Sequence, residues 1–181
     1  EHLRHHSEPM ESIYPSSSDA YPEIVTGTEG AMAPLAVWSV ADDQPSYHVL
    51  IVDDELSNLK VAADVIAGMR HSYTAVRSGE AAREALQQRK PDLVLLDLMM
   101  PGISGLDICR DIRALHSLSE LPVLMLTASG QTADMLSAFA VGANDILQKP
   151  FELAEFRARV QSLLSMKGSS EQALRREMDF L

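Results

Sequence analysis

Residues 93–102 read LVLLDLMMPG, and this stretch decides the fold of the chain. Positions 93–96 are all apolar, without the alternation of a strand that has one face in water. Continuous apolar strands are typical of parallel sheets that helices cover on both faces. The apolar run ends at Asp97. We therefore expect a buried parallel strand with an acid at its carboxyl end.

Strand-like and helix-like segments alternate on both sides of this stretch. The helix-like segments carry apolar residues three and four positions apart, as at Leu59, Ala63 and Ile66. We expect strands at residues 48–52, 73–76, 93–96, 123–126 and 145–147, and helices at residues 55–69, 79–88, 104–116, 131–141 and 152–166. Strands that alternate with helices five times predict an α/β fold, a doubly wound, five-stranded parallel sheet with right-handed crossovers.

Charge and proline content separate the domain from what precedes it. Residues 1–46 hold eight acidic residues, one basic residue and five of the nine prolines. This composition predicts an acidic linker that is largely disordered, because it buries too little apolar surface to offset its chain entropy. Within it, residues 35–40 (LAVWSV) either dock on a neighbour as a short strand or remain part of the linker. Residues 47–166 form the predicted domain.

The last fifteen residues, 167–181, predict the start of a linker or coiled-coil helix that is cut short. We expect a break after the preceding helix and a new helix start capped by Ser169 or Ser170, with coiled-coil spacing of apolar residues beyond it. Fifteen residues are too few for a helix-turn-helix domain, so we expect no DNA-binding output in this chain.

Composition excludes several classes of protein. The single cysteine, Cys109, rules out an internal disulfide framework. The net charge of −11 argues against non-specific binding of nucleic acid through a basic surface. No apolar run approaches the ~18 residues that a membrane span needs, and the first residues lack a signal-peptide pattern. We expect a cytoplasmic protein, whose longer parent could be anchored in a membrane.

Polar residues follow the predicted strands. Asp53 and Asp54 end the first strand, Asp97 the third, Thr127 the fourth and Lys149 the fifth. The carboxyl ends of parallel strands meet at one edge, where such sheets bind ligands. Three acids that lie close together repel unless a cation lies among them, and Mg²⁺ suits such oxygen ligands. Each residue alone could serve as a cap or a surface group, but their coincidence favours phosphoryl chemistry.

Four blocks of the sequence resemble the signature of response-regulator receiver domains. They are residues 49–55 (VLIVDDE), 93–102, 126–128 (LTA) and 149–151 (KPF). Their order and spacing match over about residues 47–166. The resemblance implies a flavodoxin-like sheet with strand order 2-1-3-4-5. It also implies transfer of a phosphoryl group to an aspartate from a histidine kinase or a histidine phosphotransfer domain.

The resemblance also assigns roles to individual residues. Asp97 matches the phosphoacceptor, Lys149 the lysine that pairs with it, and Thr127 the hydroxyl that reports the phosphoryl group. Mg²⁺ or Mn²⁺ would be held by Asp54, Asp97, the backbone carbonyl of Met99 and, partly through water, Asp53. A cis Lys149-Pro150 bond is typical of the family.

One switch position departs from the family pattern. Ile146 stands where the family commonly has a tyrosine or phenylalanine that moves together with the threonine. The usual aromatic switch is therefore in doubt. Receiver domains of this family often dimerise on activation. The resemblance therefore implies a homodimer through residues 131–166 or through the C-terminal helix.

Three hypotheses describe the parent protein. The first, which we favour from sequence, is a hybrid sensor histidine kinase. The second is a response regulator without its effector domain. The third is a haloacid-dehalogenase-like phosphatase, although that family has Asp-x-Asp after its first strand and this chain has adjacent acids. In none of the three cases do we expect the chain to be an independent multiple-turnover enzyme with an external substrate. Its chemistry is self-phosphorylation and hydrolysis of its own acyl phosphate.

Overall fold

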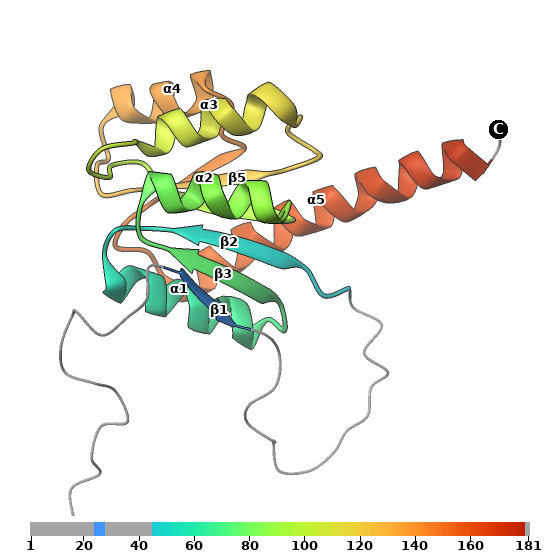
Figure 1. Ribbon diagram of the computed structural model, residues 1–181, viewed down its shortest axis with the longest axis horizontal. Helices are drawn as coiled ribbons and strands as arrows, with labels where there is room; N and C mark the ends of the chain where they lie inside the picture. The colour runs from blue at the N-terminus through green and yellow to red at the C-terminus, as the bar shows by residue number, and fades with distance from the viewer. Residues whose placement is uncertain (1–23, 28–44, 180–181) are drawn as a thin grey trace, which may run out of the picture.

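The computed structural model describes residues 24–27 and 45–179 (Figure 1). The strands are β1 (Ile24–Gly27), β2 (His48–Val52), β3 (Ser72–Val76), β4 (Leu93–Asp97), β5 (Val123–Thr127) and β6 (Asp145–Gln148). The helices are α1 (Leu56–Gly68), α2 (Gly79–Gln88), α3 (Gly105–Leu115), α4 (Thr132–Ala140) and α5 (Leu153–Asp179). The predicted alternation of strands and helices is therefore confirmed.

Five of the six strands in the sheet run parallel to one another, and these five lie in the expected order. The sheet runs β1-β3-β2-β4-β5-β6, so β2 to β6 show the 2-1-3-4-5 order of a flavodoxin-like fold. In the centre, Val52 of β2 pairs with Leu96 of β4, and Asp97 pairs with Leu126 of β5. This register places the ends of β2, β4 and β5 at the same edge of the sheet.

The sixth strand, β1, was not predicted. It pairs antiparallel with β3, and Ile24 lies opposite Val76. The sequence analysis assigned these residues to a largely disordered linker, and for residues 24–27 that assignment is wrong. The edge of β3 offers unpaired backbone N–H and C=O groups, and the sequence IVTG is rich in β-branched residues. The segment at residues 35–40, for which we considered a docked strand, lies outside the described residues.

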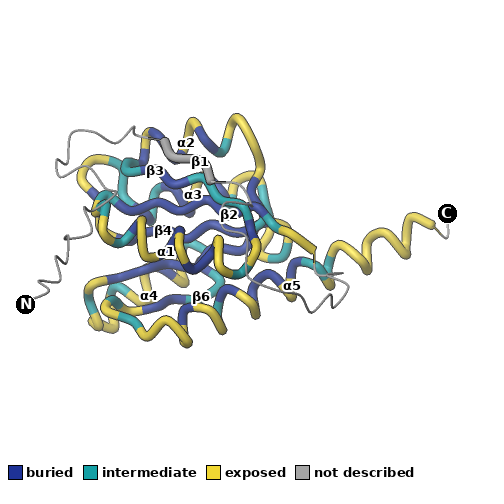
Figure 2. Tube along the Cα trace, turned by 90° about the horizontal axis from the view of Figure 1, so that it is seen from below, coloured by how far each residue is buried: buried dark blue, intermediate teal, exposed yellow. Residues whose placement is uncertain are grey.

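Helices cover both faces of the sheet. Helices α1 and α5 lie on one face, and α2, α3 and α4 lie on the other (Figure 1). Every residue of β2, β4 and β5 is buried, which explains why these strands are apolar without alternation (Figure 2). On the first face, Ile66 of α1 and Phe156 and Val160 of α5 belong to one apolar cluster. On the second, Ile108 and Ile112 of α3 belong to another.

Side-chain caps fix two of the helix starts. Ser104 and Asp107 form a reciprocal capping box at α3, and Ser78 accepts a hydrogen bond from the N–H of Ala81 at the start of α2. At α1 the N-cap residue is Glu55, and its side chain makes no capping hydrogen bond. The carboxylate of Asp53 instead accepts the N–H of Glu55 at 2.9 Å.

Helix α5 is longer than predicted. It runs without a break over 27 residues, and its last turns extend beyond the sheet (Figure 1). The expected break and cap are therefore wrong, and the Ser169 hydroxyl donates to the carbonyl of Ser165 within the helix. Tyr47 packs closely against the helix at Gly168, where an added Cβ would lie 2.6 Å from the Tyr47 hydroxyl. Among the described residues, no helix is long and apolar enough to cross a membrane.

A buried lysine anchors the middle of α5. The Lys167 side chain is 2% exposed, and its ammonium group donates to the carbonyl of Glu120 at 2.9 Å. The same group lies 3.1 Å from Glu171 Oε1 and 3.5 Å from Asp92 Oδ1. These contacts satisfy the buried charge and connect α5 to the loops before β4 and β5.

Candidate functional site

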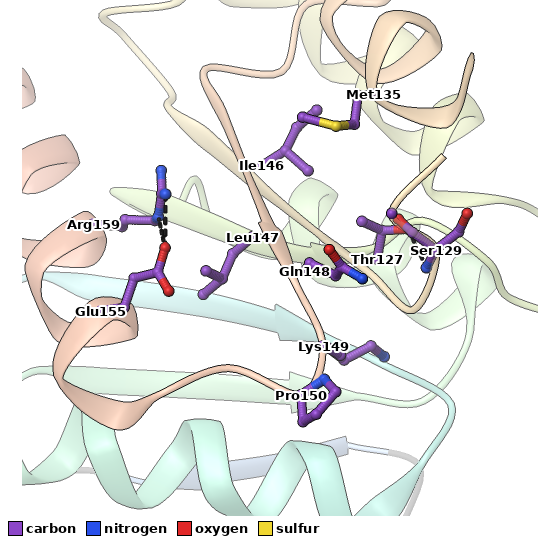
Figure 3. Close-up of a pocket in the computed structure, with 11 residues that line it drawn as sticks. Thr127, Ser129, Met135, Ile146, Leu147, Gln148, Lys149, Pro150, Glu155 and Arg159 are labelled. Atoms are coloured by element: carbon purple, nitrogen blue, oxygen red, sulfur yellow. Dashed lines mark hydrogen bonds and ion pairs between the residues drawn. The ribbon is translucent and has the colours of Figure 1, made fainter. Parts of the chain in front are cut away.

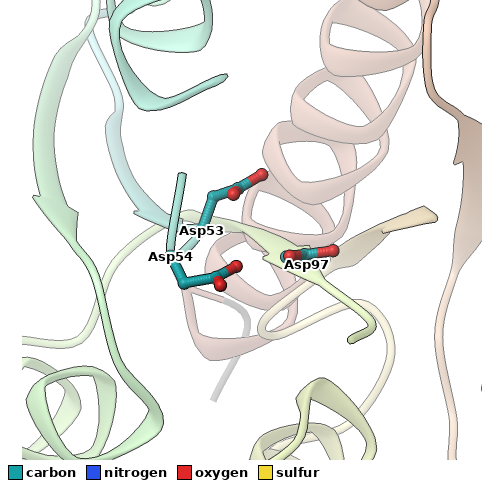
Figure 4. A group of neighbouring side chains, drawn as sticks. All are labelled: Asp53, Asp54 and Asp97. Atoms are coloured by element: carbon teal, nitrogen blue, oxygen red, sulfur yellow. The ribbon is translucent and has the colours of Figure 1, made fainter. Parts of the chain in front are cut away.

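Three carboxylates gather at the carboxyl edge of the sheet, as predicted (Figure 4). Asp53 and Asp54 directly follow β2, and Asp97 is the last residue of β4, the neighbouring strand. One oxygen from each carboxylate lies within 4.8 Å of the others. Asp53 is 1% exposed and Asp97 is 4% exposed, whereas Asp54 is partly open to solvent. Parallel pairing of β2 with β4 therefore creates the cluster.

Lys149 lies between the two buried acids. It follows β6, and its ammonium group is 3.0 Å from Asp53 Oδ2 and 3.3 Å from Asp97 Oδ1. Its backbone N–H donates to the carbonyl of Thr127 at 2.7 Å, which ties the end of β6 to the end of β5. The Lys149-Pro150 bond is cis, as expected. One cation thus bridges acids that come from two different strands.

The electrostatics of the cluster favour the binding of a further cation. Burial and, to a smaller extent, the charge of Asp53 raise the pKa of Asp97 to about 6, against the opposing effect of Lys149. Burial lowers the pKa of Lys149, but its contacts with Asp53 and Asp97 outweigh burial and leave it raised. Three carboxylates against one ammonium group leave an excess of negative charge.

The donor set fits a divalent metal ion such as Mg²⁺. Oxygen ligands from Asp53, Asp54 and Asp97 are what this ion prefers, and a site with few protein ligands leaves room for water and substrate oxygens. Met99, the predicted carbonyl ligand, lies two residues beyond Asp97, and its side chain is exposed. Its N–H donates to Asp97 Oδ1 at 3.5 Å.

The Thr127 hydroxyl points into its own loop. Thr127 is buried at the end of β5, donates to the carbonyl of Ser129 at 3.2 Å and accepts the Ser129 N–H at 3.1 Å. A cavity of about 540 Å³ lies beside it, lined in part by Lys149, Met135 and Ile146 (Figure 3). Ile146 is buried against this cavity, near Met135 of α4. The predicted switch residues therefore share one hollow between β6 and α4.

Sequence reasoning missed some residues that contact the acids. The side-chain amide of Asn58 donates to Asp53 Oδ1 at 3.3 Å, and the Arg77 guanidinium donates to the carbonyl of Asp54 at 3.3 Å. A Cβ at Gly105 would collide with the carbonyl oxygen of Asp97, so this close approach requires glycine. Asn58 lies five residues after Asp53 at the start of a helix, and this spacing could have revealed it.

Cys109 takes no part in the site. It is buried on α3, where its thiol lies 3.6 Å from the carbonyl of Val141. Burial raises its pKa, which disfavours the reactive thiolate. Cys109 is therefore a packing residue of the core.

Comparisons with known proteins agree with the geometry. A family model described as "Response regulator receiver domain" matches residues 49–161. The DNA-binding response regulator MtrA of Mycobacterium tuberculosis is 38% identical over 122 residues, which cover 67% of this chain and 52% of that protein. The probable transcriptional regulator ycf27 of Guillardia theta is 38% identical over 123 residues, 68% of this chain and 47% of that protein. The chain thus spans about half the length of these curated relatives.

Solved structures show the same fold. A crystal structure of a putative response regulator from Chloroflexus aurantiacus has 35% identity and a TM-score of 0.62, and it covers 67% of this chain and 99% of that one. The BeF3-activated DrrB receiver domain has 28% identity and a TM-score of 0.62, with the same coverage of both chains.

Proposed function

Because this chain belongs to the response regulator receiver domain family of two-component signalling, we propose that it accepts a phosphoryl group on Asp97. The donor is a phosphohistidine of a histidine kinase or a histidine phosphotransfer domain. The observation that supports this proposal is the bridging position of Lys149 at the carboxyl edge of the sheet. Its ammonium group lies 3.0 Å from Asp53 Oδ2 and 3.3 Å from Asp97 Oδ1. A cation among buried acids is the arrangement that phosphoryl transfer needs.

The chemistry is a single displacement at phosphorus. A carboxylate oxygen of Asp97 attacks the phosphorus atom, the bond between phosphorus and the imidazole nitrogen breaks, and its electron pair stays on the histidine. At neutral pH Asp97 is ionised, since its pKa is about 6. The Lys149 ammonium group lies where it can pair with a phosphoryl oxygen. Bound Mg²⁺, held by Asp53, Asp54, Asp97 and the carbonyl of Met99, would neutralise charge on the phosphoryl oxygens.

The response to phosphorylation starts at Thr127. Its hydroxyl now bonds within the loop to Ser129, and a phosphoryl group on Asp97 offers stronger, charged acceptors. Turning toward them would release the Ser129 contacts and move the loop that leads into α4. Ile146 has no ring and no hydroxyl, so the signal passes through aliphatic packing with Met135 rather than an aromatic rotamer.

Intact-protein mass spectrometry tests this function. The chain is incubated with acetyl phosphate, with and without Mg²⁺, beside the Asp97→Asn variant. We expect one phosphoryl adduct that requires Mg²⁺ and is lost in the variant. A folded wild-type protein that binds Mg²⁺ but gains no adduct from acetyl phosphate or from a phosphorylated histidine kinase would refute the proposal.

For the parent protein, we favour a response regulator over the hybrid kinase that the sequence first suggested. Two of the relatives at 38% identity carry the names of a DNA-binding response regulator and a transcriptional regulator. The haloacid-dehalogenase alternative finds no such support. Sequencing the coding region beyond Leu181 tests the choice: a DNA-binding domain supports the regulator, and a histidine-bearing helix with an ATP-binding domain supports the kinase.

Pairing of two copies belongs to the same proposal. Leu136 and Phe139 on α4 and Leu153 on α5 are large, exposed apolar residues within the predicted dimer segment, residues 131–166. Leu174 and Met178 are exposed on the end of α5, the other predicted surface. Light scattering before and after phosphorylation, on Phe139→Asp and Met178→Asp variants, identifies which surface pairs.

A further inference from the structure

The two oxygens of the Asp53 carboxylate have different partners. Oδ1 accepts the backbone N–H of Glu55 at 2.9 Å and the side-chain amide of Asn58 at 3.3 Å. Oδ2 accepts the Lys149 ammonium group at 3.0 Å. Since Lys149 also contacts Asp97, Oδ2 is the oxygen on the side of the phosphoacceptor. The two neutral donors thus hold Oδ1 on the α1 side and leave Oδ2 toward the acid cluster.

We propose that Asn58 is a positioning residue for metal binding, which fixes the carboxylate plane of Asp53 so that Oδ2 faces the cation site. This inference rests on the proposed function. Groups that orient a metal ligand through hydrogen bonds contribute to affinity without touching the metal. The Asn58 amide is suited to this role because it is neutral: it restrains the carboxylate and leaves its full negative charge for the metal.

The restraint of Asp53 by Asn58 matters because Lys149 and the metal compete for the same carboxylate oxygen. Both cations need Oδ2, because Oδ1 already has two donors. If Asp53 could rotate freely, it could follow the ammonium group and leave the other two acids. With Oδ1 held by Asn58 and Glu55, Asp53 stays beside Asp97 when Lys149 shifts toward that carboxylate.

A purely structural role for Asn58 predicts different results. Its amide also donates to Glu55 Oε2 at 3.1 Å, a contact within the first turn of α1. If that contact were its only purpose, replacing Asn58 would change the stability of the helix and leave Mg²⁺ affinity unchanged. Alanine favours helices more than asparagine does, so Asn58→Ala does not weaken α1 through intrinsic propensity.

Titration calorimetry of Mg²⁺ into the unphosphorylated, full chain is the test. We compare the wild type with Asn58→Ala, and with Asn58→Leu, which keeps the branching of the side chain at Cγ but has no donor. The control is Ser57→Ala, an exposed neighbour on the same turn. Urea unfolding in EDTA is measured for every variant.

We expect both Asn58 variants to bind Mg²⁺ about ten-fold more weakly, with Ser57→Ala unchanged. Unchanged affinity in Asn58→Ala and Asn58→Leu, whether or not their stability changes, would overturn the inference and leave the proposed function intact. A folded wild type that binds no Mg²⁺ at all would overturn the proposed function itself, so the two failures are distinguishable.

Discussion

Replacing the phosphoacceptor should make the metal-free protein more stable. Burial and the charge of Asp53 raise the pKa of Asp97 from 3.8 to about 6. The folded protein therefore holds this proton up to about pH 6, whereas the unfolded chain releases it near pH 4. Stability is lost as the pH rises through that window, because the unfolded state then binds fewer protons than the folded state. Asp97→Asn keeps the shape of the side chain and removes the charge.

The size of the effect follows from the pKa. One pKa unit corresponds to about 1.4 kcal/mol, so the rise to about 6 gives an upper bound of about 3 kcal/mol at pH 7.5. Lys149 keeps a partner in Asp53, so its charge remains compensated in the variant. We expect a gain of about 1–3 kcal/mol in the free energy of unfolding at pH 7.5. At pH 5 the gain should be about half as large.

Urea unfolding in EDTA, followed by circular dichroism at pH 7.5 and pH 5, measures this difference. The control is Asp64→Asn, an exposed acid on α1, which should change stability by no more than about 0.5 kcal/mol. Added Mg²⁺ should stabilise the wild type more than Asp97→Asn and reduce the gap. An Asp97→Asn protein no more stable than the wild type at pH 7.5, or a gain independent of pH, would refute the reasoning.

Three further substitutions test the electrostatics and the core. In urea unfolding without metal, Lys149→Met should lower stability by about 2–4 kcal/mol, because two buried acids lose their cation. Added Mg²⁺ should restore part of this stability. An unchanged stability would contradict the bridging role of Lys149. Lys167→Ala should lower the free energy of unfolding by about 1–3 kcal/mol, whereas Arg175→Ala, a control at an exposed position of the same helix, should not. Equal effects of the two substitutions would argue against Lys167 as the anchor of α5. Phe156→Ala should cost about 3–5 kcal/mol in the same assay, and a cost under 1 kcal/mol would contradict its place in the core.

The parallel sheet and its acid cluster were predictable from sequence, because both depend on local pattern. Unbroken apolar runs such as residues 93–96 identify strands that are buried on both faces. Each run ends in a polar residue, and parallel pairing brings those ends together whatever the details of packing. Asp53, Asp97 and Lys149 could therefore be assigned to one site from the sequence alone. The structure places Lys149 within contact distance of both acids.

The tertiary structure alone decided features that depend on contacts between residues far apart in sequence. Helix α5 continues through Gly168, where local pattern indicated a break, and the adjacent Lys167 donates to the carbonyl of Glu120, 47 residues earlier. Strand β1 forms because β3 offers an open edge. The raised pKa of Asp97 also belongs to the folded state, since burial by surrounding elements and the charge of Asp53 on the neighbouring strand produce it. Sequence determined which groups meet at the edge of the sheet, and folding determined how strongly they act on one another, because burial sets the strength of electrostatic interactions.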